Sequence, residues 1–211
     1  MRRQLYFDGP ENLFAAVDTA LNNPTVGIVV VRDLVTPEYL EKMAAISEKV
    51  KIENDTREDL LYKDVPELEA IDVYVGEWWR RNGYSEYRLS TGKVEFSGVY
   101  EEEKKPHLDD EKTPSYGPLT VSIGAVGVST LFGEKRGRRT IRPDRHFNPD
   151  SYSGWHETVK NLSRPLKDRV LQRPRDGVLI AAHPSAAAHA VAIDRKPRRA
   201  YLYDYHIVRT K

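Results

Sequence analysis

The chain contains no cysteine among its 211 residues. This absence excludes disulfide-stapled folds, thiolate nucleophiles, iron–sulfur clusters and cysteine-bound zinc, so any metal must be bound by His, Asp or Glu. Long apolar segments are lacking too, because the longest runs, Val26–Val31 and Val178–Ala182, are far shorter than the ~20 residues of a membrane helix. The N-terminal residues also lack the apolar stretch of a secretory signal. We therefore expect a cytoplasmic protein that does not enter a membrane.

An overall excess of charge is also missing, since the formal net charge is only +1. The two halves nevertheless differ: residues 1–112 carry 24 acidic and 15 basic side chains, whereas residues 113–211 carry 8 acidic and 18 basic ones. Two explanations stay open. The halves could form oppositely charged layers that attract each other, or the basic half could present a face to an anionic partner.

The length predicts a single domain over residues 1–211. Apolar residues at helical spacing predict helices over 11–22, 36–50 and 66–82, so residues 1–90 are expected to form a mainly helical layer. Within this layer the β-branched run Val26–Val31 predicts one buried strand. Short segments rich in Val, Ile and Tyr then predict strands at Lys93–Tyr100, Leu119–Phe132, Asp176–Ala182, Ala190–Ile193 and Arg199–Val208. Helices followed by many strands predict an α+β fold with a sandwich or barrel, a class that includes jelly rolls.

Candidate metal ligands lie in the second half. His107 and Asp109 alternate along one segment, so in an extended conformation both would face the same way. His189 opens a short apolar strand, and Arg199 follows ten residues later. Two imidazoles and one carboxylate are the ligand set of a non-haem Fe(II) site, and an arginine can bind a cosubstrate carboxylate bidentately. His183, at the end of the preceding apolar strand, competes with His189 as the third ligand.

The order of these residues resembles the 2-oxoglutarate- and Fe(II)-dependent oxygenases, whose core carries H-x-D, then His, then Arg. The resemblance covers about residues 94–133 and 176–209. The segment Pro118–Gly124, PLTVSIG, is also similar to a Pro-led strand that follows the H-x-D in the AlkB-like branch. AlkB-type enzymes carry a second arginine six residues after the first, where this chain has Tyr205.

The resemblance implies a double-stranded β-helix (jelly-roll) core over residues 91–211 with the helical layer beside it. It implies Fe(II) bound by His107, Asp109 and His189, with 2-oxoglutarate bound by Arg199 and, as a second contact, by Tyr100. Such an enzyme uses O2 to oxidise 2-oxoglutarate to succinate and CO2 while it hydroxylates or demethylates an organic substrate.

The substrate class stays open because of a basic insert, residues 133–175. It holds 12 Lys and Arg against five acidic residues, with Phe147, Tyr152 and Trp155 interleaved. Basic side chains neutralise phosphates and aromatic rings stack on bases, so a nucleic-acid base is as admissible a substrate as a small molecule. An insert of this composition is equally a solvated lid that pairs with the acidic helices. The alternative function is a non-enzymatic jelly-roll module whose basic face binds nucleic acid or a protein. The sequence does not decide the oligomeric state.

Overall fold

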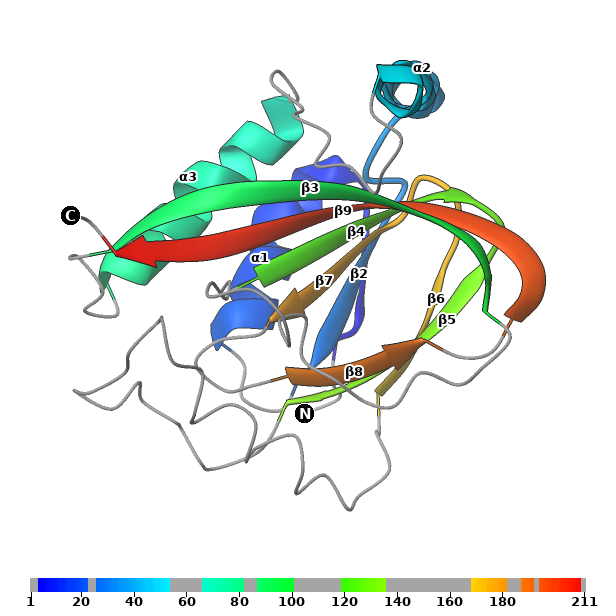
Figure 1. The fold of residues 1–211 in the computed structure, drawn as a ribbon. Helices are drawn as coiled ribbons and strands as arrows, with labels where there is room; N and C mark the ends of the chain where they lie inside the picture. The colour runs from blue at the N-terminus through cyan, green and yellow to red at the C-terminus, as the bar shows by residue number, and fades with distance from the viewer. Residues whose placement is uncertain are drawn as a thin grey trace.

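The computed structural model describes residues 4–22, 26–53, 66–81, 87–100, 119–135, 168–181, 187–191 and 194–209. Within these ranges the protein is a mixed α+β structure with two sheets and three α-helices. The helices lie on one side of the larger sheet, and the smaller sheet lies on its other side (Figure 1). The predicted α+β class is therefore confirmed.

The three helices agree with the predicted ones to within a few residues. They are α1 (Leu13–Asn22), α2 (Pro37–Glu53) and α3 (Pro66–Arg81), and a 3-10 turn, η1 (Pro10–Asn12), precedes α1. The start of α2 follows from its sequence, because the Thr36 hydroxyl accepts a hydrogen bond from the Tyr39 amide at 3.2 Å. No helix among the described residues is long and apolar enough to cross a membrane.

The larger sheet has six strands, and both halves of the chain contribute to it. In spatial order they are β1 (Tyr6–Asp8), β2 (Ile28–Arg32), β7 (Gly177–Ala181), β4 (Leu119–Val126), β9 (Asp194–Arg209) and β3 (Tyr87–Tyr100). The β1–β2 pair is parallel and the other pairs are antiparallel. The N-terminal ninety residues thus supply strands as well as the helical layer, and β1 was not predicted.

The smaller sheet has the order β6 (Asp168–Gln172), β5 (Ser129–Lys135) and β8 (Ala187–Val191). One prediction is corrected here, and one strand was not predicted. The segment expected as one strand, Leu119–Phe132, is divided between the two sheets by a turn at Gly127, whose φ of 72° suits glycine. The end of the basic insert is strand β6, with alternate residues buried, because alternation rather than apolar content marks a strand with one buried face.

Strand β2 separates two apolar clusters. Val29 and Val31 belong to the cluster between the larger sheet and the helices, whereas Ile28 and Val30 pack toward the smaller sheet. All four side chains are 0% exposed. A strand that is buried on both faces reads as a continuous apolar run, which is why this strand was predictable.

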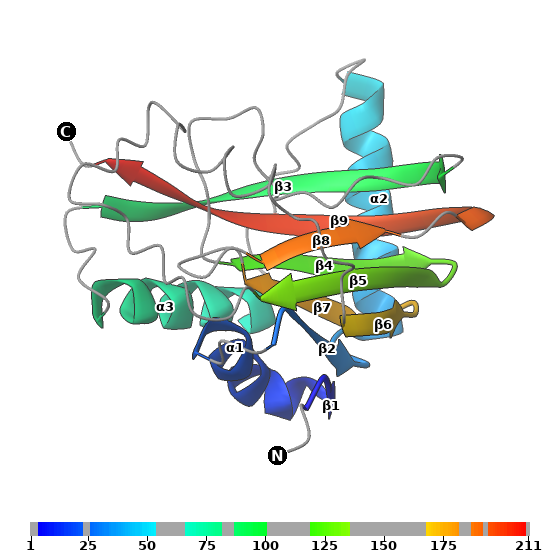
Figure 2. The same cartoon turned by 90° about the horizontal axis from the view of Figure 1, so that it is seen from below.

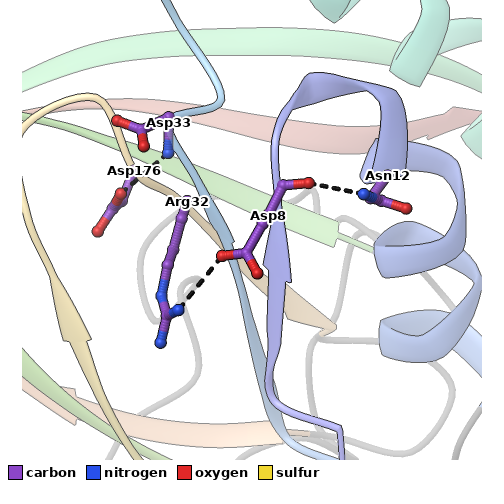
Figure 3. A network of polar contacts seen from close by, with 5 residues as sticks. All are labelled: Asp8, Asn12, Arg32, Asp33 and Asp176. Carbon is purple, nitrogen blue, oxygen red and sulfur yellow. Dashed lines mark hydrogen bonds and ion pairs between the residues drawn. The ribbon is translucent and has the colours of Figure 1, made fainter.

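Polar contacts join β1, β2 and the turn before β7 (Figure 3). Arg32 forms an exposed ion pair with Asp8 at 3.2 Å, and the Asn12 amide donates to the Asp8 carbonyl at 2.6 Å. The Asp176 carboxylate, 4% exposed, accepts a hydrogen bond from the Asp33 amide at 3.1 Å. The buried carboxylate therefore connects the end of β2 to a turn more than 140 residues away in the chain.

Candidate functional site

One face of β9 packs against the helices. Tyr201, Tyr203 and Tyr205 alternate along the strand, and each is no more than 1% exposed. The Tyr203 hydroxyl is hydrogen-bonded to the Tyr39 hydroxyl and lies 3.9 Å from Met43 Sδ, both on α2. Burial raises the pKa of Tyr205 well above its usual range. This face of β9 therefore belongs to the core under the helical layer.

The other face of β9 looks toward the smaller sheet. Leu202 lies opposite Ser122 of β4, and residues that face each other across an antiparallel pair share a face of the sheet. Ser122 contacts Gln172 of β6, whose Nε2 donates to the Ser122 carbonyl at 2.7 Å and lies 3.1 Å from its Oγ. By alternation, Ala200 and Arg198 lie on the same face as Leu202. The Arg198 side chain is only 5% exposed.

The predicted cosubstrate arginine, Arg199, lies on the opposite face. Strand β9 pairs with β3 without a register shift from Arg209 to Arg198, so the alternation is unbroken there. Arg199 shares the face of Tyr201, is half-buried, and stands opposite Ser97. Alternation thus assigns Arg198, which spacing overlooked, to the face of β9 that looks toward the smaller sheet, at the point where the β4–β9 register shifts between Gly124 and Val126. In the sequence, the alternation of the small Ala200 with the large Tyr201 is the signal that could have assigned the two arginines to different faces of the strand.

His189 lies in the smaller sheet, on β8, directly opposite Gly133 of β5. A Cβ built on Gly133 would approach the Ile28 Cβ to 3.0 Å, so this position faces β2 of the larger sheet. The register therefore places residue 189 on the face of the smaller sheet that looks toward the larger one. Figure 2 shows β8 lying in front of β9 and β4 in this arrangement.

Of the other predicted site residues, only Tyr100 lies within the described part of the chain. Tyr100 is the last residue of β3 and pairs with Asp194, after a register shift that follows Gly98. His107, Asp109 and the competing His183 lie outside the described residues. Within the described part of the chain no cluster of three His, Asp or Glu side chains could hold a metal ion. That part contains only one of the three predicted ligands.

The fold resembles that of solved 2-oxoglutarate- and Fe(II)-dependent oxygenases. The chain is similar to the non-haem α-ketoglutarate-dependent carbocyclase SnoK from nogalamycin biosynthesis, with a TM-score of 0.51 and 17% identity over 85% of this chain and 80% of that one. It is also similar to an oxidoreductase of the 2OG-Fe(II) oxygenase family from Burkholderia pseudomallei, with a TM-score of 0.52 and 14% identity over 97% of this chain and 95% of that one. No protein-family model and no curated protein sequence matches the chain. The resemblance to this oxygenase superfamily is confirmed for the fold, and the AlkB-like branch stays a prediction.

Proposed function

We propose that the protein is an Fe(II)- and 2-oxoglutarate-dependent dioxygenase with a double-stranded β-helix core. It would hydroxylate or demethylate an organic substrate. One observation carries the proposal: residue 189 stands on the inner face of the smaller sheet, and the buried Arg198 stands on the inner face of the larger one. The similarity to solved oxygenases of this fold supports it.

The proposed iron ligands are His107, Asp109 and His189. Their nitrogen and oxygen donors suit Fe(II), and the absence of cysteine leaves no thiolate to compete for the metal. When bound, Fe(II) supplies the activation of O2 that couples oxidation of 2-oxoglutarate to oxidation of the substrate. The chain would supply these three side chains as ligands and leave room beside the metal for 2-oxoglutarate and O2.

The far carboxylate of 2-oxoglutarate would be bound by an arginine at the start of β9. Spacing selects Arg199, whereas the strand alternation selects Arg198, and Tyr100 is proposed as a second contact. A guanidinium that is 5% exposed binds a carboxylate more strongly than an exposed one, because the surrounding dielectric constant is lower. A planar guanidinium also matches the two carboxylate oxygens, which a lysine cannot do.

The test of the activity is succinate release by the purified, Fe(II)-loaded protein with a panel of candidate substrates. We expect the variants His107→Ala and Asp109→Ala to lose succinate release to the background level. His189→Ala should lose it as well, and His183→Ala, six residues away, is the matched control that should retain it. An active His107→Ala or Asp109→Ala protein would overturn the assigned site.

The variants Arg198→Gln and Arg199→Gln test which of the two arginines binds the carboxylate, because each removes one positive charge from one of two adjacent positions. If Arg198 binds the carboxylate, its variant should raise the KM for 2-oxoglutarate about 30-fold or more, as loss of a buried ionic contact does. The Arg199 variant should then change this KM by less than about threefold. The reverse pattern would assign the contact to Arg199.

The alternative is a binding module that performs no oxidation. Anaerobic addition of Fe(II) and 2-oxoglutarate discriminates between the two functions, because the enzyme should develop a weak visible charge-transfer band and the module should not.

The substrate class is a second question. If the basic insert, residues 133–175, binds nucleic acid, the affinity should fall steeply with salt, whereas turnover of a small uncharged substrate should not.

A further inference from the structure

Strand β3 forms one border of the larger sheet. It pairs with β9 along almost its whole length, and no described strand pairs with its other side. Its 14 residues, YRLSTGKVEFSGVY, contain no proline. A long edge strand without proline exposes a row of backbone donors and acceptors that can pair with another strand, and natural proteins cover such edges or blunt them with charged side chains and bulges.

We propose that β3 pairs with β3 of a second copy of this chain, antiparallel, about a two-fold axis at Val94. The two larger sheets would then form one continuous sheet. The sequence is self-complementary in this register: Lys93 stands opposite Glu95 of the partner subunit, and the reverse pair forms on the other side of the axis. Gly92 likewise stands opposite Phe96, an aromatic residue that can cover the glycine backbone. Opposite charges at facing positions stabilise a strand pair.

Neighbouring registers are less favourable. Moving the axis to Lys93 would place Lys93 opposite itself, and moving it to Glu95 would place Glu95 opposite itself. Like charges directly opposite each other destabilise a strand pair. A two-fold axis perpendicular to the sheet leaves each side chain on the same face in both copies. A register shifted by one residue would therefore pair residues that point to opposite faces, which a strand pair does not allow. The two charges therefore select the register centred on Val94.

The helical layer is compatible with this pairing. Helix α2 runs across the strands, and its C-terminal end extends past β3 (Figure 2). In the proposed dimer, the sheet of the second copy continues past β3 along this end of the helix. The helix would then cover part of the sheet of the partner, in a region where no described strand of its own chain lies.

The charges give the first test, by light scattering on the full chain at several concentrations. The wild-type protein should be a dimer of 24.2 kDa chains. Lys93→Glu or Glu95→Lys creates two like-charge pairs and should raise the dimer dissociation constant about tenfold or more. The double variant Lys93→Glu/Glu95→Lys restores opposite charges and should dimerise like the wild type. A mixture of the two single variants should form a heterodimer, because each then supplies the charge that the other lacks.

The absence of cysteine gives a second test. Val94→Cys would introduce a single thiol beside the two-fold axis, close enough to its counterpart for a disulfide, so mild oxidation should give a covalent dimer. Ser90→Cys is the control, because its counterpart would lie eight residues away along the pair, roughly 27 Å. Circular dichroism of each variant establishes that it is folded.

Three results would overturn the proposal. The first is a wild-type protein that is monomeric at all concentrations, which would show that β3 does not pair with a second copy of the chain. The second is a dimer that neither charge reversal weakens. The third is equal cross-linking of the Val94→Cys and Ser90→Cys variants, which would indicate random collision.

Discussion

At the scale of single residues, Gln172 shows how the two sheets are held together. Its side chain is 1% exposed and reaches from β6 to Ser122 on β4. The amide satisfies a buried carbonyl, and an unsatisfied buried polar group is costly. A polar residue in a predicted polar insert is thus part of the interior, which neither composition nor apolar periodicity indicates.

We expect Gln172→Ala to lower the free energy of unfolding by about 1–3 kcal/mol, because the buried hydrogen bond from the Gln172 amide to the Ser122 carbonyl is lost. Leu171→Ala on the same strand is the control. Leu171 is 39% exposed, so its truncation should change stability by only about 0.5 kcal/mol. Urea denaturation measures both. Equal losses in the two variants would argue that the amide does not join the sheets.

Tyr74 gives a prediction about pH. Burial, followed by its hydrogen bond to Asp18 at 2.8 Å, raises its pKa to about 12, against about 10 in an unfolded chain. The folded state thus holds this proton more tightly, so the contribution to stability is complete below pH 10 and is lost as the pH rises toward 12. Tyr74→Phe should cost about 1 kcal/mol at pH 8 and less at pH 11, as measured by urea denaturation. A difference that does not shrink would contradict the assigned shift.

At the scale of elements, the close approach of β4 to the β6–β7 turn depends on Gly124. Its amide donates to the Asp176 carbonyl at 2.9 Å, and its carbonyl accepts from the Arg175 amide at 2.8 Å. A Cβ at this position would meet the backbone carbonyl of Arg173. The turn can therefore sit against the strand only where a side chain is missing.

Gly124→Ala should accordingly lower the free energy of unfolding by about 1–3 kcal/mol, since backbone must move to admit the methyl group. Gly177→Ala is the matched variant, because the Cβ there meets the end of the Leu34 side chain and not backbone. We expect a loss below about 1 kcal/mol for it. Thermal or urea unfolding of both proteins checks the order, and a larger loss at Gly177 would refute it.

The sequence predicted elements well where one local pattern decides them. The helices and β2 were foreseen because apolar spacing and continuous apolar runs reflect burial directly. It did not foresee β6, because the strand lies in a basic context and only Val170 of its inner face is apolar. Spacing also selected Arg199 without weighing Arg198, because spacing does not distinguish the two faces of a strand, and the assignment of Arg199 stays a prediction. His107 and Asp109 remain predictions from sequence alone.

At the scale of the whole molecule, two apolar clusters share the same strands. Val178 and Ile180 of β7 belong to one cluster, and Leu179 and Ala181 belong to the other. Loss of either cluster would therefore expose one face of a strand that the other cluster needs. We infer that the clusters cannot unfold separately.

Unfolding should therefore be one transition. Tryptophan fluorescence and far-UV circular dichroism should give the same urea midpoint, although two of the three tryptophans, Trp78 and Trp79, lie on α3 and the dichroism reports on all elements. Two separated midpoints would contradict the shared interior. The experiment needs dilute protein, so that association does not shift the curves.

The position of β2 has a consequence for synthesis of the chain. Val29 pairs with Leu179, 150 residues later, so the ribosome must make most of the protein before β2 gains this neighbour. Until then only β1 can pair with β2, so the other edge of this apolar segment of high β-propensity stays open, and such segments associate between nascent chains. Slower translation lengthens this exposure. Yield of the native protein should therefore depend on chaperones that shield such segments more than on its final stability.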